Sequence, residues 1–359
     1  MAAFTKEEVS RIWLSFADLP PAKITAILST YESALHYFTA FDAKMWELLP
    51  LGAYNALKKL HHRDALLMEL ETLHDLGVHI ITEPPERFEV ISDPPMILYT
   101  LGDETLLEAE KIISIVGTRR ATAYGRLMAQ SIAEELAKQG VVIANGFASG
   151  IDSEALQGAL KANGKCIAFL GSGIGSIYPP ENDALYHQIL DKGGLIVSEY
   201  PPGIAPLGHH FPQRNRLISA VADGVLLIES KPDGSGGTIT VGHATEQGKD
   251  VFVLPGPANS ELYQMPHALI RDGARLVTCA KDIFADMGWE EKVGTAADVL
   301  LTPEQAQIMA VLNSQEASFD EIAEKTGQNP AKLNSGLTIL ELAGIIKKSA
   351  GRIYMKVKR

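Results

Sequence analysis

Six short apolar runs recur from residue 111 onward, and they constrain the fold of this chain more than any other feature. The runs are KIISIVG, VVIANGF, KCIAFLG, GLIVSEY, GVLLIES and DVFVLPG, each followed by a turn rich in Gly, Ser or Pro and then by a helix-like segment. Strands that are apolar throughout, rather than alternating with polar residues, are buried on both faces. The pattern predicts a parallel sheet covered by helices, with right-handed crossovers. RLVTCA, at 275–280, is expected to add an edge strand.

The segments on either side of this repeat predict two smaller domains. Residues 1–85 show helical periodicity, as in PAKITAILSTYESALHYF, and lead into the Pro-containing stretch TEPPERFEVISDPP. Residues 300–359 contain three helix-like segments followed by IIKKSAGRIYMKV, a pattern typical of a winged helix. We therefore predict an α/β fold with a helical domain over 1–85, a sheet domain over 86–290 and a winged-helix domain over 300–359.

Charge and cysteine content restrict the kind of protein this is. The chain has 32 Lys and Arg against 44 Asp and Glu, a formal net charge of −12. The field of the whole molecule would repel a polyanion, so a nucleic acid has to bind at a local cationic patch. Cys166 and Cys279 stand in apolar runs, which predicts neither a disulfide nor a Cys-based metal site. With no signal-peptide pattern and no apolar segment of membrane-spanning length, we expect a cytoplasmic protein without membrane contact.

Polar, glycine-rich loops follow the predicted strands. They are GTRRATAYG, GFASGIDSEA, GSGIGSIYPPEN, SEYPPG leading into FPQRNR, and ESKPDGSGGTIT. The carboxyl ends of parallel strands meet at one edge of the sheet, where open α/β sheets form their ligand crevice. Backbone N–H groups at the helix starts that follow such loops suit phosphate or carboxylate groups. The sequence therefore predicts an anion-binding rim at this edge.

The stretch HHFPQRNRLIS, residues 209–219, concentrates cations in an acidic chain. Arg214 and Arg216 have two possible roles, contact with a bound anion or pairing with the acidic loops of the sheet. Arg119 and Arg120 follow the first strand and either line the rim or lie in a solvated turn. These alternatives stay open at the level of sequence.

Three other kinds of site have weaker support. His209 and His210 have no third ligand at metal spacing, which favours capping or packing over zinc, and no metal is predicted. Ser149, Asp152 and Ser153 fit a turn with an Asp N-cap better than a nucleophilic site, because no general base accompanies them. The run GSGIGS lacks the third glycine at dinucleotide spacing and follows the third strand rather than the first, so no cofactor is predicted.

Seven longer motifs stand in one order along the chain: IVGTRRATAYG, ANGFASGIDSEALQGAL, IAFLGSGIGSIYPPEN, IVSEYPPG, FPQRNRLISA, SGGTITVGHATEQGKDVFVLPGP and ALIRDGARLV. In order and spacing, over about residues 111–280, they resemble the DNA-processing protein A family (DprA, also called Smf). The flanks are similar to that family's frequent plan, with a sterile-alpha-motif-like or helix-hairpin-helix-like domain first and a winged helix last. The resemblance implies an extended Rossmann-like domain that binds single-stranded DNA, forms a homodimer and loads RecA recombinase during natural transformation, without being an enzyme.

The resemblance also implies which residues contact DNA. The cations of FPQRNR would lie with Arg119 on the crevice rim and contact phosphates, and Tyr178 or Phe211 would stack on bases. The implied dimer interface includes Leu262, Leu269 and Ile270, whose alternative role is to pack the final helix on the sheet. The full set of expected DNA-binding residues is Arg119, Ser149, Gly150, Gly173, Tyr178, Asn182, Phe211, Arg214, Asn215, Arg216, Ser235 and Gly236.

This chain departs from the family pattern in three places. Pro180 stands where many relatives have the Lys of a YPK motif, so one phosphate contact is in question. Met265, Pro266 and His267 replace a usual Gly-x-Asn near the self-association and recombinase-binding surface. LPPAK, in the first domain, stands where a helix-hairpin-helix would have a Gly-containing turn.

Two rival functions come from the same sequence. DGSGGTITV, at 233–241, partly matches a motif of nucleoside-monophosphate phosphoribohydrolases, but Val241 fills the acidic position that would stabilise the transition state. A transcription factor is disfavoured because the candidate recognition helix PAKLNSGLTILELAG has few base-reading side chains. For the winged helix, a partner-protein or autoregulatory role is the milder expectation.

Overall fold

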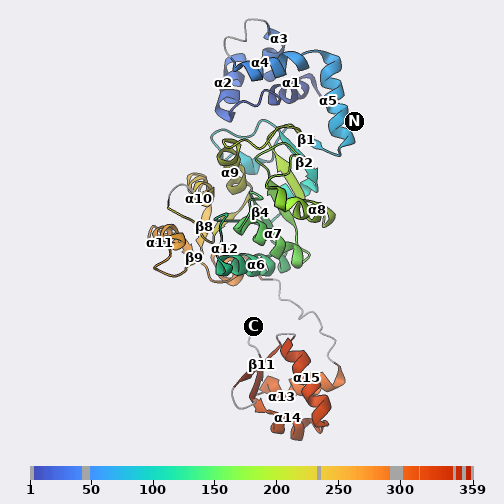
Figure 1. Cartoon of the computed structure of the whole chain (residues 1–359), viewed down its shortest axis with the longest axis vertical. Coiled ribbons are helices and arrows are strands. Elements are labelled where there is room, and N and C mark those ends of the chain that lie inside the picture. Colours follow the sequence, from blue (N-terminus) through green and yellow to red (C-terminus); the bar gives the residue numbers. More distant parts are fainter. Residues whose placement is uncertain are drawn as a thin grey trace. The chain divides into compact units, whose positions relative to one another are not determined.

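The computed structural model (Figure 1) describes residues 4–42, 49–232, 236–291, 302–314, 316–342, 345–349 and 353–356. The chain divides into two compact units, Met1–Glu290 and Glu291–Arg359. The first contains the helical N-terminus and the sheet, and the second contains the C-terminal helices and hairpin.

A nine-stranded sheet forms the centre of the first unit. Its strands are β1 (His79–Ile81), β2 (Leu98–Gly102), β3 (Ile112–Val116), β4 (Val142–Asn145), β5 (Cys166–Phe169), β6 (Leu195–Ser198), β7 (Gly224–Leu227), β8 (Asp250–Val253) and β9 (Arg275–Leu276). The order across the sheet is β1-β2-β6-β5-β4-β3-β7-β8-β9. The seven strands β3 to β9 run parallel to one another. Strand β2 is antiparallel to β6, and β1 is antiparallel to β2. The six apolar runs and the edge strand are confirmed as strands of a mostly parallel sheet.

Helices cover both faces of this sheet. One face carries α6 (Ala123–Lys138), α7 (Ile151–Lys161), α8 (Asp183–Asp191) and α12 (Ala280–Met287), and the other carries α9 (His210–Val221) and α10 (Gly236–Glu246). Strand β3 shows why its run is apolar throughout. Ile113 and Ile115 pack into the first core, and Ile112 and Val116 pack into the second. Since successive side chains of a strand point to opposite faces, both sets must be apolar.

The N-terminal helices are α1 (Lys6–Ser15), α2 (Pro21–Tyr31), α3 (Ala34–Ala40), α4 (Leu51–Leu60) and α5 (Arg63–Asp75). They enclose a small core around Trp13, whose Nε1 donates to the Leu57 carbonyl at 2.9 Å. They also contact the sheet, because Ser15 Oγ lies 2.7 Å from the hydroxyl of Tyr99 in β2. Strand β1 precedes residue 86, the domain boundary expected from the sequence. No helix among the described residues is long and apolar enough to cross a membrane.

The second unit is a winged helix, as predicted. Its elements are α13 (Pro303–Ser314), β10 (Ala317–Ser318), α14 (Phe319–Thr326), α15 (Pro330–Leu342), β11 (Ile346–Ser349) and β12 (Ile353–Lys356). The three strands pair in the order β10-β12-β11. Ile308, Leu333 and Tyr354 meet in its core. Ser318 begins α14 with a capping box, in which its hydroxyl accepts from the N–H of Glu321 and its N–H donates to the Glu321 carboxylate.

Cys166 and Cys279 are both free thiols. Cys166 lies in β5, where burial raises the pKa of its thiol to about 12. The group is therefore protonated at neutral pH and is a packing residue rather than a nucleophile.

Candidate nucleic-acid interface

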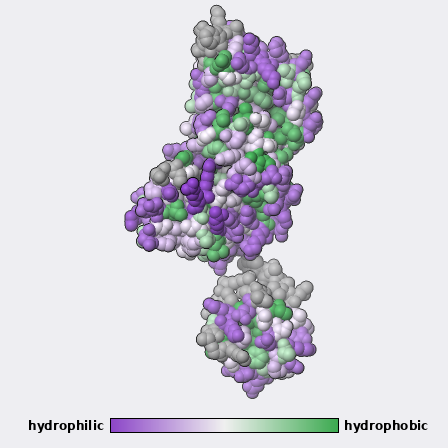
Figure 2. All heavy atoms as spheres, in the orientation of Figure 1, coloured by the Kyte–Doolittle hydropathy of each residue, from purple (hydrophilic) through white to green (hydrophobic). Residues whose placement is uncertain are grey.

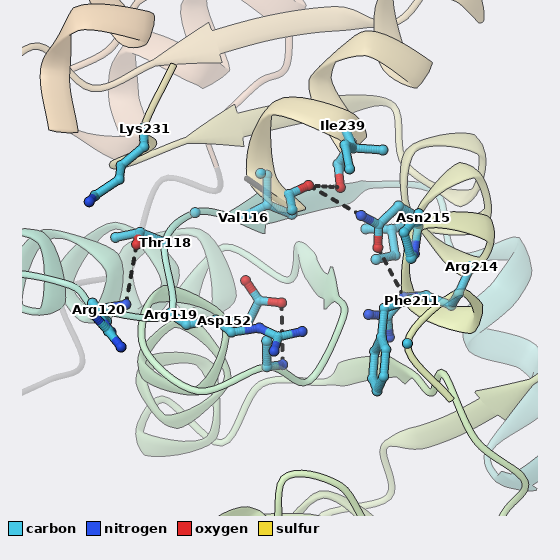
Figure 3. Close-up of a pocket in the computed structure, with 18 of the residues that line it drawn as sticks. Val116, Thr118, Arg119, Arg120, Asp152, Phe211, Arg214, Asn215, Lys231 and Ile239 are labelled. Carbon is cyan, nitrogen blue, oxygen red and sulfur yellow. Dashed lines mark hydrogen bonds between the residues drawn. The ribbon is translucent and has the colours of Figure 1, made fainter. Parts of the chain in front are cut away.

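A crevice of about 670 Å³ opens beside the carboxyl ends of β3 and its neighbours. Strand β3 is the point at which the strand order reverses, with β4 on one side and β7 on the other. Ligands of open α/β sheets bind at such switch points. The walls come from residues 116–120, from the loop before α7 and from the first turns of α9 and α10 (Figure 3). Loops that are far apart in the sequence thus meet where the strand pattern predicted.

The loops after β3 and β4 pack closely against each other. The N–H of Ile151 donates to the carbonyl of Thr118 at 3.2 Å. Gly150 has φ +84, and a Cβ at this position would lie 2.5 Å from the Thr118 oxygen and 2.6 Å from the Arg119 oxygen. A larger residue would push the loop that carries Arg119 out of place. Gly150, an expected DNA-binding residue, is buried and positions that loop.

Three exposed cations, Arg119, Arg120 and Lys231, line the crevice. The guanidinium carbon of Arg119 lies 5.4 Å from the ring centroid of Phe211. Within the described residues, none of the three side chains forms an ion pair, so their charges are available to an anionic ligand. Figure 2 shows strongly hydrophilic surface on the first unit between the positions that α10 and β4 occupy in Figure 1.

Tyr178 and Phe211 form an aromatic wall at this site. Their ring centroids are 5.4 Å apart, and Tyr178 is 39% exposed. Phe211 lies directly against Gly171, where a Cβ would come within 2.7 Å of the ring. A second pocket of about 140 Å³, lined in part by Ser149 and Pro180, adjoins both rings. Aromatic faces next to cations suit the stacking of unpaired bases.

Arg214 lies in the floor of the crevice and not on its rim. It is 4% exposed. Its Nη1 donates to the carbonyl of Gly146 at 2.8 Å and to that of Phe169, and its Nε donates to Asn215 Oδ1 at 3.1 Å. Burial lowers the pKa of the guanidinium to about 10. The sequence placed Arg214 beside Arg119 as an outward-facing phosphate contact, whereas in the fold it lines the crevice from below.

Asp152, in the first turn of α7, is the second group of the floor. It is 6% exposed, and its Oδ2 accepts from the N–H groups of Gly146 at 3.1 Å and Ala148 at 3.4 Å. Burial raises the pKa of the carboxyl to about 6, against the lowering effect of Arg214. The predicted N-cap role is wrong, because Gly150 occupies the N-cap position of α7.

Arg216 does not line the crevice. It is 4% exposed, and Nη1 and Nη2 donate to the two carboxylate oxygens of Glu199 at 2.9 and 2.7 Å. Asp93 lies 3.4 Å from its Nε. Of the two roles considered from the sequence, pairing with acidic loops is the one that this geometry supports. The expected phosphate contact is therefore not retained, because the buried charge of Arg216 is already compensated by two partly buried carboxylates.

Two more expected residues line the crevice. Asn215 and Gly236 lie in its wall, and Asn215 Nδ2 donates to the Gly236 carbonyl at 3.2 Å. Ser149 faces the smaller pocket, where its hydroxyl donates to Glu181 at 2.8 Å. Ser235 lies outside the described residues.

Asn182 and Gly173 support the loops from behind. Asn182 is buried, and its Nδ2 donates to the carbonyl of Phe147 at 2.9 Å. Gly173 is buried against the Pro201 carbonyl, and its N–H donates to the carbonyl of Ile204 at 2.9 Å. Neither residue lines the crevice or the smaller pocket beside Phe211. Both residues therefore hold the neighbouring loops in place and do not face the crevice.

The residues expected at a dimer interface lie on or next to α11 (Gln264–Arg271). Leu262, Leu269 and Ile270 are all partly buried, and Leu269 packs against the hydrophobic core. Within Met265–His267, the stretch that differs from the family pattern, the His267 ring nitrogen lies 3.1 Å from the Gly256 carbonyl. Because these side chains are only partly buried, α11 could also contact a second copy of the chain.

Sequence reasoning missed Lys231 as a crevice residue. Lys231 comes four residues after Leu227 in β7, and Arg120 comes four residues after Val116 in β3, with Val116 and Leu227 paired in neighbouring strands. Cations at equivalent positions after two adjacent strands are brought together by the fold. This shared position was the signal that would have identified Lys231.

His210 has a packing role, as favoured from the sequence. Its ring stacks on Tyr200 at a centroid distance of 3.9 Å, and its Nε2 lies 3.1 Å from a carboxylate oxygen of Asp18. His209 lies next to it, with the ring centroids 4.4 Å apart. In the part of the chain that the structure describes, no group of three or more His, Cys, Asp or Glu is placed to hold a metal ion.

The rival sites fit this geometry poorly. Val241 is buried in α10 among core residues, so the position where a phosphoribohydrolase would need a carboxylate faces the hydrophobic interior. In GSGIGS, a dinucleotide-like run, Gly171 packs on Phe211 and Gly173 packs on Pro201. Protein atoms therefore occupy the space that a pyrophosphate would need.

Comparison with known proteins agrees with this architecture. Residues 79–288 match the family model described as DNA recombination-mediator protein A, and residues 294–352 match the DprA winged helix domain. The protein Smf of Escherichia coli K12 is 34% identical over 284 residues, which cover 77% of this chain and 75% of Smf.

Two solved structures are also similar. The crystal structure of DNA processing protein A from Streptococcus pneumoniae aligns with a TM-score of 0.60 and 30% identity, covering 79% of this chain and 98% of that one. A structure of DNA processing protein A from Helicobacter pylori, described for its single-stranded DNA binding mode, aligns with a TM-score of 0.54 and 31% identity, covering 58% and 95%. The strand order, the crevice loops and these matches together show that this chain belongs to the DNA recombination-mediator protein A (DprA/Smf) family.

Proposed function

We propose that this chain binds single-stranded DNA in the crevice without strong sequence preference. The observation that carries the proposal is the composition of the crevice mouth, where exposed Arg119, Arg120 and Lys231 stand beside Tyr178 and Phe211. Cations attract phosphates without regard to sequence, and aromatic faces stack on any base. The Helicobacter pylori relative, which is described as binding single-stranded DNA, lends further support.

The charge of the molecule bears on how this binding depends on salt. The net charge is −12, and the free positive charge of the crevice comes from three exposed side chains. Three neutralised phosphates on a single strand correspond to a slope of log affinity against log salt of about −2. The contribution of stacking adds to affinity without adding to this slope. We infer a binder whose salt dependence is shallow.

The test is a titration of the full chain with a single strand, the corresponding duplex and a mononucleotide. We expect the single strand to bind most tightly, because bases paired in a duplex cannot stack on Tyr178 and Phe211. The slope against salt is expected near −2 for the single strand. Equal affinity for the duplex would contradict the proposal, since it would mean that the aromatic wall takes no part.

We further propose that the chain acts in the cytoplasm, delivers the bound strand to RecA during natural transformation and DNA recombination, and works as a homodimer. These parts rest on membership of the family whose model is described as a recombination mediator. Faster nucleation of RecA on a strand carried by this chain than on the naked strand would support the delivery step. A binding role is favoured over a catalytic one because Val241 replaces the carboxylate of the related hydrolase motif.

The homodimer is tested at α11 by light scattering. Ile270→Arg places a charge on a partly buried residue outside the core clusters, and the expected result is a folded monomer. Leu127→Arg is the matched control, because Leu127 is an exposed leucine of α6 and its change should leave the dimer intact. A dimer that survives Ile270→Arg with unchanged affinity would assign α11 to intramolecular packing alone.

A further inference from the structure

The floor of the crevice carries one acidic and one basic group, each held from behind. Asp152 uses Oδ2 to accept from two backbone N–H groups, and Arg214 uses Nη1 and Nε to donate to neighbouring oxygens. Asp152 Oδ1 and Arg214 Nη2 have no hydrogen-bond partner among the residues the structure describes. Both residues are more than nine-tenths buried and both line the crevice. In Figure 3 they approach it from different elements, α7 and α9.

These two groups form no ion pair with each other in the described structure. They are close enough for each charge to favour the ionised form of the other. Asp152 Oδ1 and Arg214 Nη2 do not belong to the buried side-chain atoms that lack a partner, so both face the open crevice and can reach a ligand there. A donor and an acceptor at the bottom of a largely buried site gain free energy when a ligand pairs with them. A ligand that presents a donor to Asp152 and an acceptor to Arg214 would satisfy both at once.

The edge of a base suits this floor better than a phosphate does. Asp152 and Arg214 together are neutral, and burial already disfavours the carboxylate, so a second anion beside it would be repelled. The positive charge of the crevice lies instead with Arg119, Arg120 and Lys231. Phosphates are therefore expected at those cations and a base at the floor. A crevice of about 670 Å³ is within the range of roughly 300–1,000 Å³ that small-molecule sites occupy.

Among the four DNA bases, guanine offers the best match along its Watson–Crick edge. Its N2 and N1 donors are adjacent, and the O6 acceptor follows them. Adenine and cytosine place a ring acceptor next to one donor group, and thymine places its donor between two acceptors. An ionised carboxylate is an acceptor only, so those ring and carbonyl acceptors would face it unfavourably.

We propose that Asp152 and Arg214 select one unpaired guanine of the bound strand, with N1–H and N2–H donating to Asp152 Oδ1 and Arg214 Nη2 donating to O6. The proposal rests on the proposed function, single-stranded DNA binding in this crevice. The remaining nucleotides stay unselected, because contacts to their phosphates carry no sequence information.

The first experiment leaves the protein unchanged and varies one base. An oligothymidine of roughly 20 nucleotides with one central guanine should bind about tenfold tighter than the same strand with adenine, cytosine or thymine there. Inosine, which lacks the 2-amino group, should lose part of this gain. O6-methylguanine, which loses N1–H, should lose all of it, and 7-deazaguanine, which keeps the Watson–Crick edge, should retain it. Equal affinity across the series would overturn the proposal.

A second experiment changes the acceptor. In Asp152→Asn, the side-chain oxygen can keep the hydrogen bonds from Gly146 and Ala148 and turn the amide NH₂ toward the crevice. Two donors then form the floor, and the matching base is cytosine, whose N3 and O2 are adjacent acceptors. The preference should move from guanine to cytosine. Glu154→Gln, in the same turn of α7 but paired with Arg126, should keep the guanine preference. An unchanged preference in Asp152→Asn would count against the proposal.

The guanine preference should also depend on pH. Burial raises the pKa of Asp152 to about 6, and Arg214 and Arg119 are the charged groups that act on it from the facing elements. Below this pKa the carboxyl is protonated and loses the acceptor that guanine needs. The gain should be nearly full at about pH 7 and largely lost at about pH 5, roughly one unit on either side of that pKa. A gain that persists unchanged at about pH 5 would contradict the assignment to Asp152.

The failure of this proposal differs from the failure of the proposed function. A chain that binds no single strand at all would sink both. A chain that binds every strand equally would sink only the guanine assignment. If free guanosine monophosphate bound more tightly than the guanine-containing strand, a nucleotide rather than a strand would be the ligand, and the strand-based proposal would be overturned.

Discussion

Replacement of Arg119, Arg120 and Lys231 together by alanine is expected to weaken single-stranded DNA binding by roughly fiftyfold at about 0.15 M salt. The three cations are exposed and line the crevice. Each phosphate neutralised on a single strand contributes about −0.7 to the salt slope, so the loss of three contacts removes a slope of about −2. If the electrostatic contribution to affinity is set to zero at about 1 M salt, a slope of about −2 gives a contribution of roughly fiftyfold at about 0.15 M, which the triple variant loses. Titrations at several salt concentrations measure both quantities.

The matched control removes the same charge elsewhere. Arg126, Lys138 and Lys161 are exposed cations paired with Glu154 or Glu134 and lie outside the crevice. Their combined change to alanine should leave the salt slope near its original value. Both triple variants should melt close to the unmodified chain, because surface cations contribute little to stability. Near-normal binding by the crevice variant, with an unchanged slope, would sink the assignment of phosphate contacts.

Arg216→Ala is expected to lower the free energy of unfolding by about 3–5 kcal/mol. The change leaves Glu199 and Asp93 without the guanidinium that compensates them. The Glu199 carboxylate is largely buried, and such a charge left without its partner is among the most destabilising single changes. The melting temperature should fall by on the order of 10 °C, as measured by calorimetry. DNA binding below that temperature should keep its original salt slope.

Arg126→Ala provides the comparison for this second result. Its ion pair with Glu154 is 2.9 Å long, but the Arg126 side chain is 46% exposed. An exposed pair is worth about 0–1 kcal/mol, so the melting temperature should hardly change. If Arg216→Ala melted normally and instead lowered the salt slope, Arg216 would be a phosphate contact after all. By the same reasoning Arg214→Ala should destabilise the chain, since Arg214 bonds two buried carbonyls.

The sheet was predictable because its signal is local. In β3, for example, five consecutive buried residues include the four apolar side chains of Ile112, Ile113, Ile115 and Val116. Such runs alternate with helical segments only when a parallel sheet is covered on both faces. The location of the crevice followed as well, because the carboxyl ends of parallel strands share one edge. Strand β1 was not predicted, since its three residues form a strand only through pairing with β2.

The roles of the arginines in FPQRNR were not predictable in the same way. Arg214 and Arg216 are two residues apart in α9, so their side chains leave the helix in directions about 200° apart. One then meets the carbonyls of Gly146 and Phe169, and the other meets Glu199. These partners come from separate strand ends, and nothing in the local sequence indicates which arginine faces which.

The sequence by itself thus determined the α/β sheet, the winged helix, the edge at which the crevice lies and the presence there of Arg119 and Phe211. Only the tertiary structure decided which polar groups at that edge remain exposed to a ligand. It placed Lys231 in the crevice, Asp152 and Arg214 in its floor, and Arg216 in a buried ion pair. The physical reason is that local periodicity sets which face of an element is apolar. The burial and charge of a polar side chain depend instead on partners brought close by the fold, such as Asp93 and Glu199 for Arg216.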